Sequence, residues 1–244
     1  MSAEESRLTK ISPGSGIVIA IDGPAGAGKT TIACHLARHF GLLNLETGAM
    51  YRAFALKALR EELTLDDGAA LETLAAETTI RLESGEEENR VFLDGEDVSG
   101  LIRNPRVTDA ASRVSTFPGV RAWMVRQQQQ LAAAGGVVME GRDIGTVVFP
   151  RAPVKIFLDA APEVRGQRRY EQLGQQVGIS APPPEEILRD LRARDERDRN
   201  RADSPLKPAP DAVILDSTQM TLEQVVAAAE AIVQAKLGES RLAS

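Results

Sequence analysis

Cysteine is almost missing from this sequence, since Cys34 is the only one among 244 residues. A single cysteine excludes an internal disulfide and a zinc site built from several thiolates. Long apolar runs are missing as well: no segment approaches the roughly 18 consecutive apolar residues of a membrane span. Residues 1–16 also lack the apolar stretch of a signal peptide. These absences favour a protein of the cytoplasm and argue against export and membrane insertion.

Basic residues are fewer than acidic ones: the sequence has 29 Lys and Arg against 35 Asp and Glu, which gives a net charge of −6. General binding to nucleic acid usually requires an electropositive face, so the composition disfavours that class of function. An ordinary apolar content of 43% instead predicts a globular chain that buries a sizeable core. Any site that binds an anion must therefore be local.

Five short apolar segments, each bounded by Gly, Pro or Asp, are typical of buried strands. These segments are 16–21, 42–45, 136–139, 154–158 and 212–215. Helical patterns lie between or after most of them, and the last helix opens with the capping-box spacing of Thr221 and Gln224. Such alternation requires right-handed crossovers and predicts an α/β fold with a five-stranded parallel sheet and helices on both faces.

Two segments interrupt this alternation. Residues 49–130 combine helical stretches with two β-prone runs at 78–82 and 90–93, which predicts an inserted α+β domain with an antiparallel hairpin. Within it, Gln127 to Gln130 are expected on a solvated helix face. Residues 173–186 are rich in glycine and proline and predict a flap. The rest of the chain is predicted to form a disordered leader at 1–15, a core domain at 16–48 and 131–237, and a tail at 238–244.

Residues 23–30, GPAGAGKT, match the complete phosphate-loop pattern G-x-x-x-x-G-K-[ST] between a predicted strand and a predicted helix. Glycines let backbone N–H groups converge on phosphate oxygens, and the helix N-terminus adds positive potential. Lys29 would reach the β- and γ-phosphates, and the Thr30 hydroxyl would bind Mg²⁺. A glycine turn that merely connects the two elements is the disfavoured alternative. The predicted ATP-binding residues are Gly23, Pro24, Ala25, Gly26, Ala27, Gly28, Lys29, Thr30, Thr31, Arg165 and Arg168.

Arginines gather in three further clusters, at 46–52, at 140–143 and at 192–201. In the last cluster the i, i+3, i+4 and i+7 spacing puts Arg194, Arg197, Asp198 and Arg201 on one helix face. Taken alone, this helix could be a solvated surface held by pairs such as Asp195 with Arg199. Beside a phosphate loop the clusters favour a second phosphate-bearing substrate, because guanidinium groups bind phosphate oxygens in bidentate fashion.

The sequence resembles the bacterial cytidylate kinases, a branch of the nucleoside monophosphate kinase family, over residues 17–237. The resemblance rests on eight segments in order: IDGPAGAGKT, ETGAMYR, DGEDVSG, FPGVR, EGRDIGTVVFP, IFLDA, RARDERDRNR and ILDST. The chain departs from the family at Glu46, where Asp is usual, and this affects a local contact.

The resemblance implies a P-loop NTPase-like kinase that phosphorylates CMP and dCMP with ATP and Mg²⁺, by direct in-line transfer and as a monomer. Residues 49–130 would form its monophosphate-binding domain, and 165–195 a lid over ATP. The implied CMP-binding residues are Thr47, Arg52, Ser112, Arg121, Arg142, Asp143, Arg194, Asp198 and Arg201. Ser112, Arg121 and Asp143 would contact the base, Arg194 and Asp198 the sugar, and Arg52, Arg142 and Arg201 the phosphate. Lys29, Arg142 and Arg194 would be the catalytic residues.

Two other classes of function stay open from the residues themselves. One is a kinase for another small acceptor, such as shikimate or a different monophosphate. The other is a nucleotide-dependent switch whose inserted domain binds a protein or RNA. His35 and His39 are spaced i, i+4 and could pair on a metal. A surface or packing role is favoured for them, because the sequence offers no further ligand nearby.

Overall fold

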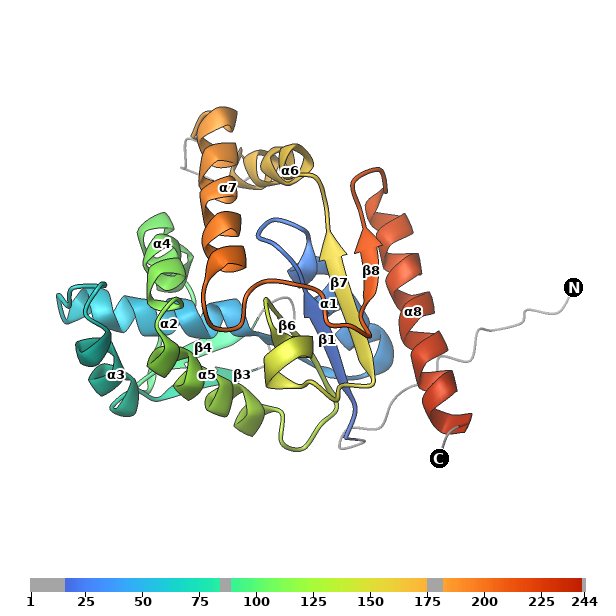
Figure 1. The fold of residues 1–244 in the computed structure, drawn as a ribbon, viewed down its shortest axis with the longest axis horizontal. Coiled ribbons are helices and arrows are strands. Elements are labelled where there is room, and N and C mark those ends of the chain that lie inside the picture. The colour runs from blue at the N-terminus through green and yellow to red at the C-terminus, as the bar shows by residue number, and fades with distance from the viewer. Residues whose placement is uncertain (1–15, 84–88, 175–181, 243–244) are drawn as a thin grey trace, which may run out of the picture.

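The computed structural model describes residues 16–83, 89–174 and 182–242, and Figure 1 shows their arrangement. The predicted leader, 1–15, and the centre of the predicted flap, 175–181, lie outside these residues. A five-stranded parallel sheet has the order β2-β6-β1-β7-β8. Its strands are β1 (Val18–Asp22), β2 (Leu43–Glu46), β6 (Val137–Gly141), β7 (Val154–Asp159) and β8 (Val213–Asp216). The predicted parallel sheet is confirmed, and the bounds of its strands differ from the predicted ones by at most two residues.

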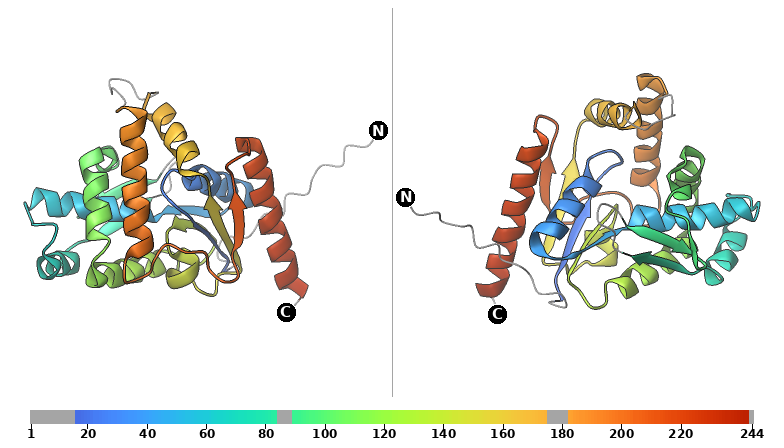
Figure 2. Two further views of the ribbon diagram at one scale, coloured as in Figure 1. Left: turned by 45° about the horizontal axis from the view of Figure 1, so that its top comes forward. Right: turned by 180° about the vertical axis from the view of Figure 1, so that it is seen from behind.

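Side chains of β1 alternate between two apolar layers, as the period of a strand requires. Ile19 and Ile21 pack against α1 (Lys29–Phe40) and α8 (Leu222–Leu242) on one face. Val18 and Ala20 belong to the opposite layer, which contains η2 (Ile144–Val148) and the end of α5 (Pro118–Leu131). Figure 2, seen from behind, places α1 in front of the strands. The expectation of helices on both faces is therefore confirmed.

The insertion lies on the side of the sheet opposite α8 (Figures 1 and 2). A three-stranded antiparallel sheet, in the order β3-β4-β5, contains the predicted hairpin and a third strand that the sequence analysis missed. The strands are β3 (Ile80–Glu83), β4 (Arg90–Leu93) and β5 (Glu96–Asp97), and the helices are α2 (Thr47–Arg60), α3 (Gly68–Ala76), η1 (Leu101–Arg103) and α4 (Pro105–Val114). Buried residues of these elements and of α5 form an apolar core of their own, which includes Phe54, Leu71 and Trp123.

Two helices, α6 (Pro162–Gly174) and α7 (Pro184–Asn200), stand beside the carboxyl end of the parallel sheet. They flank the predicted flap, and α7 carries the arginines of the third cluster except Arg201, which follows its last residue. The last helix, α8, continues to Leu242, so the predicted tail is helical as far as that residue. Its expected capping box is present: the Thr221 amide donates to Gln224 Oε1 at 2.9 Å, and the Gln224 amide donates to Thr221 Oγ1 at 3.3 Å.

The expectation of a solvated face for Gln127 to Gln130 is wrong for Gln128, which is only 2% exposed. Its neighbour Gln129 donates a hydrogen bond to the carbonyl of Val148 at 3.0 Å. The reason is that α5 lies between the insertion and η2, so polar side chains on it contact protein on more than one side.

Within the described ranges, no helix is both long and apolar enough to cross a membrane.

Candidate active site

The phosphate loop connects β1 to α1 and folds tightly against β7. A Cβ atom on Gly23, whose φ is 152°, would lie 2.0 Å from the carbonyl oxygen of Leu158, so only glycine fits there. Lys29 is 6% exposed, and its Nζ donates to the carbonyl of Pro24 at 2.7 Å. Burial, followed by the charge of Arg142, lowers the pKa of Lys29 to about 7. A bound phosphate would place an opposite charge beside this ammonium group and so favour its protonated form.

Strand register brings the phosphate loop and two of the arginine clusters, 46–52 and 140–143, to one edge of the sheet. In β6, Glu140 lies opposite Ile21 of β1 and Glu46 of β2, so the carboxyl ends of the three strands are level. The Thr47 hydroxyl donates to the Glu140 carbonyl at 2.7 Å, which joins the start of α2 to the end of β6. The carboxyl edge of an open α/β sheet is where ligands bind in folds of this class.

Glu140 is a functional candidate that the sequence analysis did not select. Its carboxylate accepts a hydrogen bond from the Thr30 hydroxyl, and burial, followed by the charge of Glu46, raises the pKa of Glu140 to about 7. Its Oε1 is buried without a hydrogen-bond partner. The only available signal was its position directly after a predicted strand, beside Arg142. Hydroxyl and carboxylate oxygens are ligands that suit Mg²⁺.

Asp22 is a second residue that the sequence analysis missed. It accepts hydrogen bonds from the backbone amides of Ile144 and Gly145, both at 2.7 Å. Burial raises the pKa of Asp22 to about 6. These bonds tie the end of β1, where the phosphate loop begins, to the turn that follows Asp143.

Next to the phosphate loop lies a hollow between the sheet edge, the insertion and α7. Its walls contain every predicted CMP-binding residue except Arg52. The lining residues are Thr47, Gly48, Tyr51, Ala111, Ser112, Ser115, Arg121, Gly141, Arg142, Asp143, Arg194, Asp198 and Arg201. The structure thus brings together, in one pocket, side chains from four separate stretches of the chain.

One wall of the pocket holds a buried ion pair between Arg121 Nη2 and Asp143 Oδ2, and each side chain is less than a tenth exposed. Arg121 also donates to the Ser115 carbonyl at 3.0 Å, which orients its guanidinium. Tyr51 lies beneath this pair, with its ring centre 5.9 Å from the Arg121 guanidinium carbon. Burial raises the pKa of Tyr51 to about 12, so its hydroxyl stays protonated and can donate.

The opposite wall is an arginine cluster around Asp198. Arg142 Nε donates to Asp198 Oδ2 at 2.8 Å, and Arg201 Nη1 lies 3.8 Å from Asp198 Oδ1. Although burial opposes it, Arg142 and Arg194 hold the pKa of Asp198 below its usual value. Burial, followed by Arg142, lowers the pKa of Arg194 to about 10. Three guanidinium groups around one carboxylate leave an excess of positive charge that suits a phosphate.

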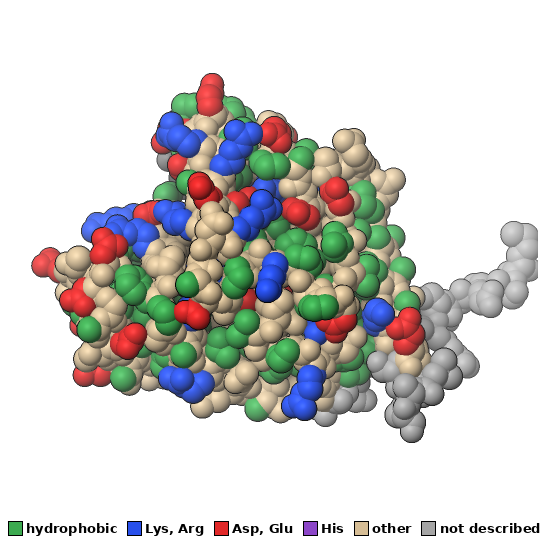
Figure 3. Space-filling model, viewed as in Figure 1, with side chains coloured by type: hydrophobic (Ala, Val, Ile, Leu, Met, Phe, Trp, Pro, Cys, Tyr) green, Lys and Arg blue, Asp and Glu red, His purple; other side chains and the backbone are tan. Residues whose placement is uncertain are grey.

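The alternative interpretation of α7, a solvated helix with Asp195 paired to Arg199, does not describe the structure. Asp195 instead pairs with Arg165 of α6 at 2.6 Å, and both side chains are buried. Figure 3 shows Lys and Arg side chains gathered along α7 and over the centre of the same face of the molecule. The inward face of α7, which carries Arg194 and Asp198, lines the pocket, whereas Arg199 is exposed.

Several polar atoms in this pocket are buried and have no hydrogen-bond partner within the protein. They are Tyr51 Oη, Ser112 Oγ, Arg121 Nε, Arg194 Nε and Arg201 Nη2. Buried polar groups are nearly always hydrogen-bonded, so such a concentration in one place indicates a polar ligand.

Comparison with known proteins shows which family this chain belongs to. The model of the family described as cytidylate kinase matches residues 19–235. The chain belongs to the cytidylate kinase family. It is 48% identical over 221 residues to a protein named cytidylate kinase from Pasteurella multocida, covering 91% of this chain and 96% of that one. It is 51% identical over 209 residues to another from Pelotomaculum thermopropionicum, covering 85% and 92%.

Among solved structures, a shikimate kinase from Bacteroides thetaiotaomicron has 16% sequence identity and a TM-score of 0.46. The match covers 89% of this chain and 97% of that one.

Two arginines predicted to bind substrates are already paired in this member of the cytidylate kinase family. Arg52 Nη2 donates to Glu46 Oε1 at 2.5 Å, and Arg52 does not line the pocket. Arg168 donates to the hydroxyl and the carbonyl of Ser217 at 3.0 and 2.9 Å. Their contacts with CMP and ATP stay predictions.

Arg165 lies beneath the phosphate loop and is 1% exposed. Its Nε donates to the Ala160 carbonyl at 2.8 Å and its Nη1 to the Ala25 carbonyl at 2.9 Å, while Nη2 pairs with Asp195. Each guanidinium nitrogen is therefore used within the protein. A direct contact with ATP stays a prediction, but the geometry favours a positioning role in which Arg165 ties the loop to α6 and α7.

We expect Arg165→Met to lower the free energy of unfolding by about 3–5 kcal/mol, because it leaves the Asp195 carboxylate buried and unpaired. Urea unfolding followed by circular dichroism measures this. Arg192→Met is the matched control: Arg192 pairs with Glu163 at 2.6 Å between the same two helices, but both side chains are exposed. It should cost less than about 1 kcal/mol. Equal losses in the two variants would contradict the positioning role.

Proposed function

We propose that this protein transfers the γ-phosphoryl group of ATP to CMP and dCMP, forming ADP with CDP and dCDP. Membership of the cytidylate kinase family supports this, and so does a pocket beside the phosphate loop with a carboxylate–arginine pair on one wall and an arginine cluster on the other. The observation that carries the assignment is the buried pair of Arg121 and Asp143, whose donor and acceptor atoms match the polar edge of cytosine.

The reaction needs positioning and charge neutralisation rather than a general base. The attacking oxygen belongs to an acceptor phosphate that is already ionised at neutral pH. The loop glycines and Lys29 would hold the donor phosphates, while Arg142 and Arg194 would orient the acceptor phosphate and stabilise the migrating group. Transfer would proceed in line, without a covalent intermediate on the enzyme.

Mg²⁺ would be held by the Thr30 hydroxyl and the Glu140 carboxylate, directly or through water. The unpartnered Oε1 of Glu140 and its contact with Thr30 fit a hard cation that prefers oxygen ligands. When bound, Mg²⁺ neutralises charge on the β- and γ-phosphates.

For the acceptor we propose an orientation that follows the family pattern and the two walls of the pocket. Ser112, Arg121 and Asp143 would contact the cytosine, and Arg194 and Asp198 the sugar. Arg52, Arg142 and Arg201 would contact the phosphate, with Arg52 first released from Glu46. We also propose that the enzyme acts as a monomer in the cytoplasm.

An acceptor panel tests the proposal: ADP formation from ATP is measured with CMP, dCMP, UMP, AMP and shikimate. We expect turnover with CMP and dCMP, and at least about tenfold lower kcat/KM with UMP. Greater activity with shikimate or AMP would contradict the assigned acceptor. Slow hydrolysis that no acceptor stimulates would instead support a nucleotide-dependent switch.

We expect Arg201→Ala to lower kcat/KM for CMP by about 10- to 100-fold, because a charge-assisted bond to phosphate is lost. The KM for ATP should change by less than about threefold. Arg199→Ala, two residues away and exposed, is the matched control and should leave both constants nearly unchanged. Steady-state kinetics with each substrate varied in turn measures the difference. Similar losses in the two variants would contradict a role for the inward face of α7.

A further inference from the structure

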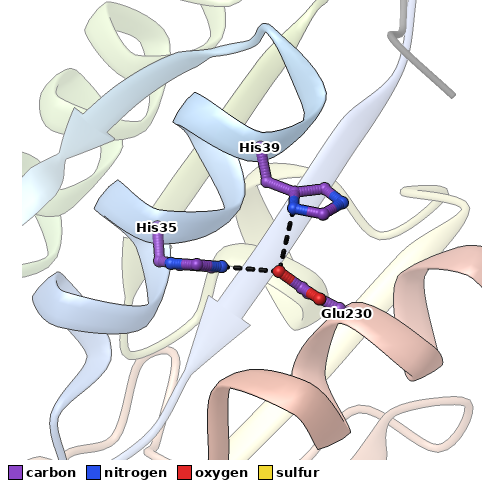
Figure 4. A group of neighbouring side chains, drawn as sticks. All are labelled: His35, His39 and Glu230. Carbon is purple, nitrogen blue, oxygen red and sulfur yellow. Dashed lines mark hydrogen bonds and ion pairs between the residues drawn. The ribbon is translucent and has the colours of Figure 1, made fainter. Parts of the chain in front are cut away.

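The only two histidines of the sequence lie on one face of α1 and point toward the same glutamate of α8 (Figure 4). His35 Nε2 is 2.6 Å from Glu230 Oε1, and His39 Nδ1 is 2.9 Å from the same oxygen. The sequence analysis favoured a surface or packing role because no further ligand was evident nearby. Tertiary structure supplies that ligand from a residue 195 positions after His35.

The chemistry of this cluster is that of a transition-metal site. Two imidazole nitrogens and one carboxylate oxygen form a donor set that binds Zn²⁺ and leaves a fourth position for water. The three ligand atoms lie within 4.8 Å of one another, and no other group of three or more His, Cys, Asp or Glu ligands is that close elsewhere in the described chain. Zinc bonds of about 2.0–2.2 Å place tetrahedral ligand atoms roughly 3.3 Å apart, so the hydrogen-bonded atoms need to separate by less than about 1 Å.

The surroundings are compatible with an ion and with solvent access to it. The His35 side chain is 40% exposed, while His39 and Glu230 are about one-fifth exposed, so water can complete the coordination. The two helices α1 and α8 are already in contact, and Leu36 of α1 belongs to the same buried apolar cluster as Ala229 and Val233 of α8. Little chain entropy then remains to be lost on binding.

We propose that His35, His39 and Glu230 bind a divalent transition-metal ion, zinc in particular, with water as the fourth ligand. The ion fastens the last helix to the helix that follows the phosphate loop. Mg²⁺ and Ca²⁺ are poor occupants because they require more oxygen ligands than the cluster offers. The site is separate from the phosphate loop, since His35 lies nearly two helical turns beyond Lys29, and its role is structural.

The test uses the full chain without an added histidine tag, treated with EDTA, dialysed, and kept in excess Mg²⁺ with ADP to occupy the phosphate site. Titration calorimetry should find one Zn²⁺ per chain. Co²⁺ should give the visible absorption of a tetrahedral site. With zinc at about 100 times its Kd, the Tm should rise by about 5–10 °C, and Mg²⁺ alone should not reproduce this shift.

Three variants separate the site from adventitious binding. His35→Ala should abolish the zinc-dependent rise in Tm and the Co²⁺ spectrum. Glu230→Gln, which keeps the size and hydrogen-bonding capacity of the side chain, should weaken zinc binding by at least about tenfold. Glu239→Gln on the same helix, where Glu239 pairs with Lys236, is the control and should bind zinc as the original chain does. A chain with no zinc-dependent change in Tm would overturn the proposal, as would a shift that survives His35→Ala.

Discussion

Lys29→Ala is expected to lower kcat by about a thousandfold or more while the protein stays folded. In the free protein the Lys29 ammonium group is buried, its pKa is lowered to about 7, and it donates a hydrogen bond to the Pro24 carbonyl. Such a group contributes little to folding, because its charge is poorly solvated. It becomes effective when donor phosphates approach and supply a counter-charge. Coupled detection of ADP, together with circular dichroism, measures both expectations.

Lys155→Ala is the matched control for this prediction. Lys155 is also a buried lysine bonded to a proline carbonyl, at 2.6 Å from Pro150, and it pairs with Asp211 at 2.8 Å, away from the phosphate loop. We expect this change to lower stability by about 1–3 kcal/mol and to alter kcat by less than about threefold. Near-normal turnover in folded Lys29→Ala protein would contradict the assignment of the phosphate loop.

Asp143→Asn is expected to lower kcat/KM for CMP by about 100-fold and to narrow the preference for CMP over UMP. Cytosine presents an amino donor at position 4, which a carboxylate accepts, whereas uracil presents a carbonyl oxygen there. A buried carboxylate that faces this oxygen costs on the order of 1–3 kcal/mol, which amounts to tenfold discrimination or more. Asparagine can donate as well as accept, so the penalty against UMP should largely disappear.

Asp198→Asn separates base recognition from general damage to the pocket. It also removes a buried carboxylate bonded to an arginine, since Asp198 pairs with Arg142. Because we place Asp198 at the sugar, its loss should lower CMP and UMP turnover together, and the ratio between them should change by less than about threefold. If Asp143→Asn also lowers both activities in parallel, Asp143 acts on phosphate geometry and our assignment of it to the base is wrong.

Local features of the chain were sufficient to predict the parts of the molecule that depend on neighbouring residues. The phosphate loop could be recognised because its backbone conformation needs particular residues at adjacent positions, such as Gly23 against β7. The five parallel strands could be recognised because each is a short apolar run between residues that end strands. Their carboxyl ends share one edge by the rules of α/β topology, which placed two arginine clusters beside the loop.

Helical periodicity predicted which residues of α7 share a face, but not what that face contacts. Asp198 pairs with Arg142 in the pocket, whereas Asp195 pairs with Arg165 rather than with Arg199. A partner one helical turn away and a partner on another helix are equally compatible with the local pattern. Burial decides between them, because a desolvated carboxylate requires the nearest available guanidinium.

Tertiary structure alone decided the features that join distant parts of the chain. Glu140 meets Thr30 through strand register, Gln128 is buried because α5 lies between two packed layers, and Glu230 reaches His35 through the docking of α8 on α1. Apart from the position of Glu140 directly after a predicted strand, none of these three features has a signature in the residues around it. Side chains far apart in sequence come within hydrogen-bonding distance only when the elements that carry them pack at one particular separation and rotation, and that packing results from the whole buried core.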